Sequence, residues 1–230
     1  MKKYELVLFD IDGTLLDFEK AERIGMKETL SWFGLRNDDE IVDSYNEINM
    51  HYWKMFERGE ISLDNLLVKR HEALFDKYGF SCNSEEFNHY YEGRLKYCGF
   101  LMDHALETLD YVKTTSCKTA VVTNGIYETQ TSRLALSRLD EYFKHVYISE
   151  KVGYSKPQKE IFQYIFRDIG QGIEKENVLI VGDSLTSDIK GGNDFGIDTC
   201  WVNPKGLENH LNLRVDYEIQ NLLQLKDIIV

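Results

Sequence analysis

The sequence predicts an α/β protein with a parallel sheet, and three observations support this fold class. An apolar run from Leu6 to Phe9 suits a strand that is covered on both faces. From about residue 103 onward, short β-rich runs alternate with helical stretches, which is typical of parallel strands joined by crossover helices. The stretch between these two parts has helical periodicity throughout. We therefore expect a sheet core that is interrupted by a helical insertion.

The helical insertion begins soon after the first expected strand. Helical periodicity runs from Thr14 to about Met102, with breaks near residues 34–39, 59–62 and 79–84. We assign residues 17–101 to this insertion, and residues 1–16 together with 102–230 to the sheet core. Because the insertion directly follows the end of a strand, we expect it to form a mobile cap over an active site.

The remaining expected strands are the β-rich runs at 119–123, 145–149, 178–182 and 199–202. Ligand sites in open parallel sheets lie just beyond the carboxyl ends of the strands. The residues that follow each of these runs are therefore the first candidates for a functional site.

The composition argues against several classes of function. The formal net charge is -12, and no cluster of Lys and Arg is present that could bind a phosphate backbone, so we expect no nucleic-acid partner. No stretch approaches transmembrane length, and Asp10 breaks the first apolar run, so we expect no membrane partner and no signal peptide. The four cysteines are scattered, without a Cys-x-x-Cys pair, which favours reduced thiols and a cytoplasmic protein.

Two carboxylates, a glycine and a hydroxyl follow the first strand in the run Asp10-Ile11-Asp12-Gly13-Thr14. An aspartate at this place can simply begin a turn. It can also stand where a substrate arrives, because it follows the carboxyl end of a buried strand.

Three more strand ends carry polar groups, each with an ordinary alternative. Thr123-Asn124-Gly125 offers a hydroxyl, an amide and a close backbone approach, but is also common turn chemistry. Lys156 precedes Pro157 and is expected to be extended and aimed at a site, although most lysines lie at the surface. Asp183 and Asp188 follow the run at 178–182, and Asp188 could merely favour the start of a helix.

Four such patterns in this order are not expected by coincidence. In this order they resemble the four motifs of the haloacid-dehalogenase-like superfamily of phosphatases, and the resemblance covers essentially the whole chain. It implies a Rossmann-like, three-layer core with an inserted helical cap of the C1 type.

The resemblance also implies a mechanism. Asp10 attacks phosphorus and forms a covalent aspartyl-phosphate. Asp12 protonates the departing ester oxygen and later deprotonates the water that splits the intermediate. The side chains of Thr123 and Lys156, with the backbone of Asn124, bind the phosphoryl oxygens.

The carboxylates predict a metal ion. Asp10, Asp12 and Asp183 would repel one another at one edge of the sheet unless a cation neutralised them. Mg²⁺ is suited to one or two carboxylates plus a substrate phosphate oxygen. By the resemblance, the Asp10 and Asp183 side chains and the backbone carbonyl of Asp12 hold it, and Asp188 supports either the metal through water or Lys156.

Longer segments are similar to the bacterial pyrimidine 5′-nucleotidase branch. They are Ile48-Asn49 with Trp53, Phe56-Glu57 and Gly59, then residues 122–125 with Gln130 and Arg133, and then residues 182–189 with 200–204. This similarity implies a small phosphomonoester substrate, a nucleoside 5′-monophosphate with a pyrimidine base. Four cap residues are candidates for base or sugar contact, although each could instead pack in the core or lie at the surface: Phe18, Asn49, Trp53 and Arg94.

Other functions remain open. The protein could hydrolyse another small phosphate ester, such as a sugar phosphate or phosphoglycolate, or act as a phosphomutase with the same pair of aspartates. A non-catalytic module that binds a phospholigand is a third possibility, because fold does not fix function. Asp12 argues against a dehalogenase, since halide release needs no proton donor. We expect a monomer or a homodimer.

Overall fold

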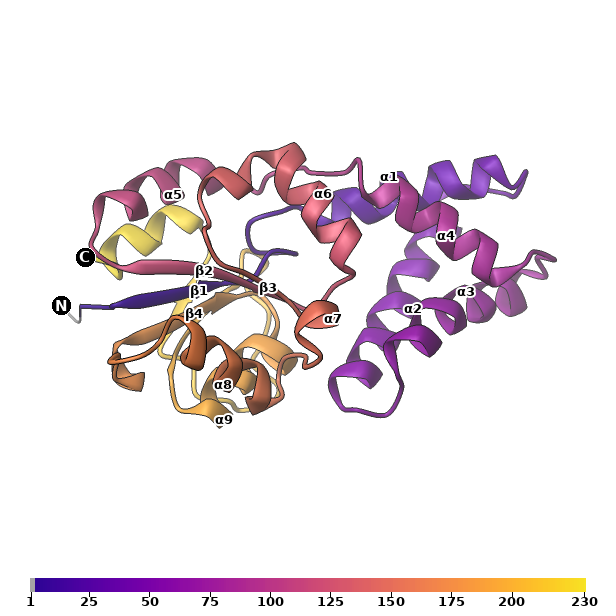
Figure 1. Cartoon of the computed structure of the whole chain (residues 1–230). Coiled ribbons are helices and arrows are strands. Elements are labelled where there is room, and N and C mark those ends of the chain that lie inside the picture. The colour runs from indigo at the N-terminus through magenta and orange to yellow at the C-terminus, as the bar shows by residue number, and fades with distance from the viewer. Residues whose placement is uncertain (1–2) are drawn as a thin grey trace. The chain divides into compact units, whose positions relative to one another are not determined.

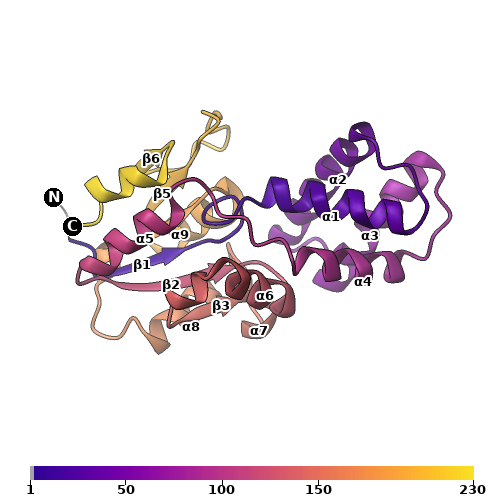
Figure 2. The same cartoon turned by 90° about the horizontal axis from the view of Figure 1, so that it is seen from above.

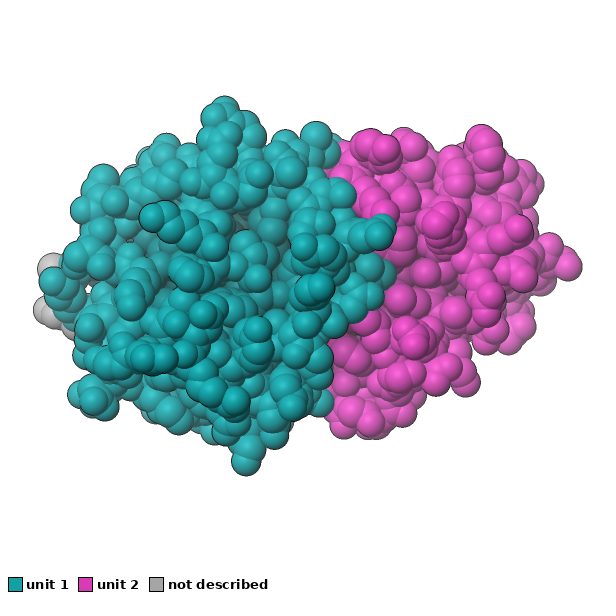
Figure 3. Space-filling model, in the orientation of Figure 1, with its two compact units in different colours: residues 1–17, 100–230 teal, residues 18–99 magenta. Residues whose placement is uncertain are grey.

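The computed structural model describes residues 3–230, so residues 1 and 2 of the expected core lie outside the described residues. The chain divides into two compact units, which are coloured separately in Figure 3. We call residues 1–17 with 100–230 the core unit, and residues 18–99 the helical unit. These bounds lie within two residues of the expected ones.

The core unit contains a sheet of parallel strands in the order β3-β2-β1-β4-β5-β6. This confirms the predicted fold class. Figure 1 labels β1 to β4 of this sheet. The strands are β1 (Leu6–Phe9), β2 (Lys118–Thr123), β3 (Val146–Ile148), β4 (Val178–Gly182), β5 (Asp198–Val202) and β6 (Tyr217–Ile219). The first strand lies at the centre, between β2 and β4, so the strand order changes direction there.

Helices cover both faces of the sheet, and the side chains of β1 alternate between them. Val7 and Phe9 join the core that contains α5 (Ala105–Thr114) and the short helix η4 (Leu222–Asp227). Leu6 and Leu8 face the opposite core, with α8 (Lys159–Asp168) and α9 (Lys190–Phe195). A strand buried on both faces explains why the run from Leu6 to Phe9 is continuously apolar.

The remaining helices of the core unit follow strand ends. They are α6 (Tyr127–Ser137) after β2, α7 (Ser149–Val152) after β3 and the π-helical turn η3 (Leu185–Ile189) after β4, with the short helices η1 (Leu139–Glu141) and η2 (Lys175–Asn177) between elements. Strand β6 was not predicted. It has only three residues, with a charged glutamate at its centre, and so gives almost no periodic signal.

The helical unit consists of α1 (Phe18–Trp32), α2 (Asp39–Glu57), α3 (Leu63–Tyr78) and α4 (Ser84–Leu95) (Figure 2). The helix breaks fall where the sequence predicts them. Asp38, Ser62 and Asn83 cap the starts of α2, α3 and α4, each side chain accepting a hydrogen bond from a backbone N–H of the first turn. Helix α1 packs against α4, and α2 against α3.

The helical unit leaves and rejoins the core unit at neighbouring residues. The backbone N–H of Asp17 donates to the carbonyl of Phe100, and Leu16 pairs with Leu101. The insertion is therefore closed at its base by backbone hydrogen bonds of the core unit. Within residues 3–230, no helix combines the length and the apolar character that crossing a membrane requires.

A buried polar network lies inside the helical unit, around Arg70. This guanidinium is 1% exposed and donates to Asn49 at 3.0 Å, to Asn88 at 2.8 Å and to Glu92 at 2.7 Å. Asn49 in turn donates to Glu22. Because a buried charge is costly unless it is paired and hydrogen-bonded, this network ties α1, α2, α3 and α4 together.

We predict that Arg70→Ala destabilises the protein by about 3–5 kcal/mol, because it breaks the largely buried ion pair with Glu92 and removes the hydrogen bonds to Asn49 and Asn88. Urea unfolding followed by far-ultraviolet circular dichroism measures the effect. Arg36→Ala is the matched control, since Arg36 pairs with Asp38 at the surface of the same unit and should contribute less than about 1 kcal/mol. Equal losses in the two variants would contradict a structural role for the buried network.

Candidate functional site

Three strand ends of the core unit meet at one place. Phe9, the last residue of β1, lies opposite Val121 of β2 and Val181 of β4. Asp10 therefore follows β1 between the ends of two neighbouring strands, at the point where the strand order changes direction. This is where open α/β sheets bind ligands.

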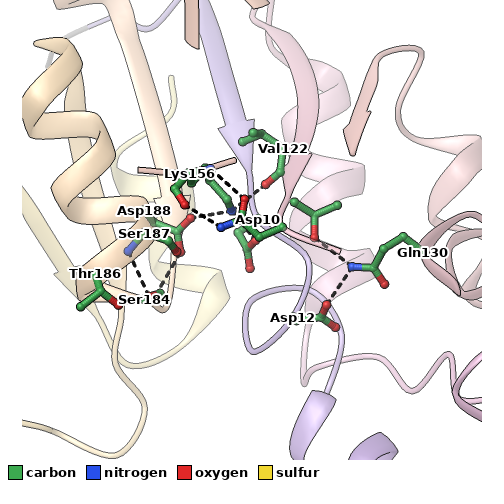
Figure 4. A network of polar contacts seen from close by, with 11 residues as sticks. Asp10, Asp12, Val122, Gln130, Lys156, Ser184, Thr186, Ser187 and Asp188 are labelled. Carbon is green, nitrogen blue, oxygen red and sulfur yellow. Dashed lines mark hydrogen bonds and ion pairs between the residues drawn. The ribbon is translucent and has the colours of Figure 1, made fainter. Parts of the chain in front are cut away.

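Lys156 connects this place to two carboxylates (Figure 4). Its ammonium is 1% exposed and donates to Asp10 Oδ1 at 2.5 Å, to Asp188 Oδ1 at 2.7 Å and to the carbonyl of Val122 at 2.7 Å. An ammonium group has three hydrogens, so all of them have protein acceptors. A phosphoryl oxygen could accept from Lys156 only by replacing one of these acceptors. In this structure Lys156 therefore orients Asp10.

Asn124 fixes the backbone that carries Lys156. The Asn124 side chain donates to the carbonyl of Lys156 at 2.7 Å and accepts from its N–H at 2.8 Å. The side chain is thus occupied in positioning Lys156, and phosphate binding by the Asn124 backbone stays a prediction. The peptide bond between Lys156 and Pro157 is cis, a feature that the sequence analysis did not predict.

Asp10, Asp183 and Asp188 form a carboxylate cluster. One oxygen from each lies within 4.8 Å of the others; Asp10 and Asp188 are buried, and Asp183 is partly exposed. Asp188 is also hydrogen-bonded at both oxygens, by Lys156 and by the backbone N–H of Ser184. Oxygen ligands of this kind suit a hard divalent cation, so the residues present fit the metal that the sequence predicts.

The electrostatics of the cluster also favour a bound metal ion. Burial raises the pKa of Asp10, the ammonium of Lys156 opposes this, and the net shift takes the pKa to about 7. Desolvation and the charges of Asp10 and Asp188 raise the pKa of Asp183. Burial disfavours the ammonium of Lys156, but the carboxylates outweigh burial and raise its pKa. One ammonium cannot balance three carboxylates, so a further cation would stabilise the charged cluster.

Two glycines make room for the cluster. A Cβ on Gly13 would lie 2.3 Å from Asp183 Oδ2, and a Cβ on Gly182 would lie 2.2 Å from Asp188 Cγ. Gly13 also has φ +79°, a conformation that other residues rarely adopt. Glycine is therefore required at both positions because a carboxyl group occupies the space of the side chain.

Asp12 lies apart from the cluster, and its side chain turns toward α6 (Figure 4). Gln130 Nε2 donates to Asp12 Oδ2 at 2.8 Å, and Arg133 Nη1 donates to Asp12 Oδ1 at 2.6 Å. Thr123, at the end of β2, accepts from the same Gln130 nitrogen at 2.9 Å. The hydroxyl oxygen of Thr123 accepts this bond, so the hydroxyl hydrogen points away from Gln130 and can be donated to a phosphoryl oxygen.

The four candidates of the helical unit have different surroundings. Asn49 is 3% exposed, and its amide is used by Glu22 and Arg70, which favours a structural role. Trp53 is half-buried, with its ring edge-on to Phe56 at 5.7 Å. Phe18 begins α1 and is also half-buried.

Arg94, the fourth candidate, pairs with Glu28 at 2.6 Å. Both residues line an open hollow of about 520 Å³ in the helical unit, together with Lys27, Ser31, Trp32, Asn37 and Tyr90. Arg94 is paired with Glu28 and lines an open hollow beside the exposed Trp32. It therefore lies at the surface of the helical unit.

Two groups outside the expected set take part in the site. Gln130 and Arg133 belong to the segments that are similar to the pyrimidine 5′-nucleotidase branch, but that similarity assigned no role to either residue. Their spacing of three residues on α6 places them on one helix face, and this is the signal that could have found them. Burial raises the pKa of the Cys82, Cys117 and Cys200 thiols, which disfavours a thiolate nucleophile at these positions.

Comparisons with known proteins agree with this geometry. The sequence model of the haloacid dehalogenase-like hydrolases matches residues 7–202. The HAD-hydrolase YfnB of Bacillus subtilis (strain 168) is 36% identical over 229 residues, which cover 100% of this chain and 97% of YfnB. The pyrimidine 5′-nucleotidase PynA of Streptococcus pneumoniae (strain ATCC BAA-255 / R6) is 37% identical over 224 residues, covering 97% of this chain and 94% of PynA.

A solved structure of YfnB has the same fold as this chain. The crystal structure of YfnB bound to magnesium superposes with a TM-score of 0.93 at 36% identity and covers 99% of each chain. The chain belongs to the haloacid dehalogenase-like (HAD) hydrolase family, which confirms the resemblance of its four motifs. It is therefore an enzyme of the hydrolase class.

Proposed function

We propose that the protein is a Mg²⁺-dependent phosphomonoester hydrolase that acts through an aspartyl-phosphate at Asp10, with pyrimidine nucleoside 5′-monophosphates as its preferred substrates. The observation that carries the chemical part is the position of Asp10. It lies beyond the end of the central strand, hydrogen-bonded to a buried lysine and clustered with Asp183. A carboxylate nucleophile, a positive charge and a metal-binding carboxylate within one small volume are what this reaction requires, which supports the proposal.

In the first half of the reaction, a carboxylate oxygen of Asp10 attacks phosphorus and the bond from phosphorus to the ester oxygen breaks. The departing oxygen needs a proton, and Asp12 donates it. Lys156 holds Asp10 for attack, while the hydroxyl of Thr123 and the backbone of Asn124 bind the phosphoryl oxygens.

In the second half, water attacks the phosphorus of the aspartyl-phosphate. Asp12, now a carboxylate, accepts the proton of this water. The bond between phosphorus and Asp10 breaks, inorganic phosphate leaves, and both aspartates return to their starting states. Each turnover thus consumes one water molecule and regenerates the enzyme.

Asp10 and Asp183 would hold the metal through their side chains, together with the backbone carbonyl of Asp12. Asp188 supports them by anchoring Lys156. When bound, Mg²⁺ neutralises the clustered carboxylates and the phosphoryl oxygens. A relative that was crystallised with magnesium, at 36% identity over nearly the whole chain, supports this choice of metal.

The preference for pyrimidine nucleotides is supported by PynA, a pyrimidine 5′-nucleotidase that is 37% identical to this chain. The polar groups of the core site serve phosphate and metal, so recognition of the base falls to the helical unit. Among its candidates we favour Trp53, because its ring is half-buried and an aromatic face can stack on a nucleobase.

We predict that Asp10→Asn lowers kcat by at least about 10³-fold while the protein still folds, because the nucleophile is lost but an amide oxygen of the same shape can still accept the hydrogen bond from Lys156. Phosphate release by the purified variant, with circular dichroism as the test of folding, measures the effect. Near-normal turnover by the folded variant would contradict the proposed mechanism.

We predict that chelation with EDTA abolishes activity and that added Mg²⁺ restores it. Asp183→Ala should raise the Mg²⁺ concentration needed for half-maximal activity, since it removes a carboxylate from the cluster. Direct Mg²⁺ titration by calorimetry gives a second readout. Full activity after thorough removal of metal would contradict the metal requirement.

For the substrate, a panel of nucleoside monophosphates, sugar phosphates and phosphoglycolate is assayed with and without Mg²⁺. We predict that Trp53→Ala raises KM for dUMP or dTMP about tenfold, within the ~1–3 kcal/mol that base stacking contributes. Hydrolysis of p-nitrophenyl phosphate should remain nearly unchanged.

Trp32→Ala is the matched control for Trp53→Ala. Trp32 belongs to the same unit, is 69% exposed and stacks on Tyr90, so its loss should leave KM for nucleotides unchanged. An equal loss on all substrates would make Trp53 a packing residue. If sugar phosphates were hydrolysed far faster than any nucleotide, the proposed nucleotidase function would be wrong, but the proposed phosphatase mechanism would be unaffected.

A further inference from the structure

Helix α6 carries a polar pair that contacts Asp12. Gln130 is 2% exposed and Arg133 is 1% exposed, so both side chains are buried although both are polar. They lie three residues apart on one helix face, and Arg133 Nη1 donates to Gln130 Oε1 at 3.0 Å. A buried guanidinium is costly unless it is paired with a charge, and Asp12 provides a carboxylate at 2.6 Å.

Both oxygens of the Asp12 carboxylate are engaged by this pair. Arg133 donates to Oδ1, and Gln130 donates to Oδ2 at 2.8 Å. Two donors from one rigid helix fix the plane and the direction of a carboxylate, and one of them is charge-assisted. Each carboxylate oxygen still has a lone pair for another partner.

The same pair reaches the expected phosphate site. The Gln130 nitrogen that bonds Asp12 also donates to the hydroxyl of Thr123 at 2.9 Å. One amide group therefore holds the proton-transfer carboxylate at a set position relative to a phosphate-binding hydroxyl.

Gly125 provides an independent observation that points to Gln130. A Cβ on Gly125 would lie 2.7 Å from Gln130 Cγ and 2.9 Å from its Nε2. Gly125 is not among the residues with positive φ, so its backbone conformation does not require glycine. The space is needed for Gln130.

We propose that Gln130 and Arg133 are positioning residues that hold the Asp12 carboxylate in line for proton exchange with the leaving group and with water. This rests on the proposed function, in which Asp12 carries the proton. A misplacement of a reacting group by about 1 Å can cost about 10²-fold in rate, which is why a rigid support is needed. Neither side chain is proposed to touch the substrate.

The test uses phenyl phosphate and p-nitrophenyl phosphate, which differ in how much the departing oxygen needs a proton. Arg133→Gln should lower kcat on phenyl phosphate by about 10- to 100-fold with little change in KM. The loss on p-nitrophenyl phosphate should be smaller, because its phenolate leaves readily. A defect of folding alone would reduce both rates equally.

A double-mutant cycle separates positioning from other effects. In the Asp12→Asn background, Arg133→Gln should cause a further loss of no more than about twofold, since its effect passes through Asp12. Likewise, Gly125→Ala should impair hydrolysis of phenyl phosphate in the native protein and much less in the Gln130→Ala background. Losses that simply multiply in both cycles would overturn the proposal.

Leu134→Ala is the control for helix α6. Its side chain is buried in the apolar core next to Arg133, so the variant should unfold at a lower urea concentration and keep the ratio of the two kcat values. An active Asp10→Asn variant would overturn the proposed function itself. Impaired Asp10→Asn and Asp12→Asn variants beside a fully active Arg133→Gln variant would overturn only the positioning role.

Discussion

The site depends on one buried ion pair network, in which the ammonium of Lys156 lies between Asp10 and Asp188. Carboxylates gathered at one sheet edge repel one another, and burial adds to the cost of ionising them. The lysine offsets part of this cost and, through its three hydrogen bonds, fixes Asp10 in direction. A nucleophilic carboxylate needs both its charge and its orientation, and this contact contributes to each.

The network demands unusual closeness of the backbone, and glycine meets this demand at three strand ends. Gly13, Gly125 and Gly182 each stand where a Cβ would overlap a polar side chain, namely Asp183, Gln130 and Asp188. Polar groups are thus packed as tightly as an apolar core is. Such packing limits rotation of the side chains, so the site is preorganised before any substrate binds.

The sequence predicted the sheet, the insertion and the helix breaks, because long apolar runs and capping residues are local signals. It missed β6, whose three residues carry a central glutamate, since short and charged strands give no periodicity. For the site, the strand-end carboxylates and Lys156 were predicted. The contacts of Asp12 with Gln130 and Arg133 were not, because they join residues more than 100 positions apart. Pairing of that kind depends on tertiary packing, which a single sequence does not reveal.

Comparing the two buried polar networks shows what separates a structural cluster from a reactive one. Around Arg70, Asn49 uses both ends of its amide within the helical unit, and Glu92 is largely buried, so little of this network faces solvent. In the core unit, Asp183 is partly exposed, and the side chain of Asp12 is 27% exposed beside a fully buried Arg133. Carboxylates that are held firmly on one side and open on the other can accept a cation or pass a proton. We therefore locate the chemistry in the core unit, although the helical unit also buries charged groups, namely Glu22 and Arg70.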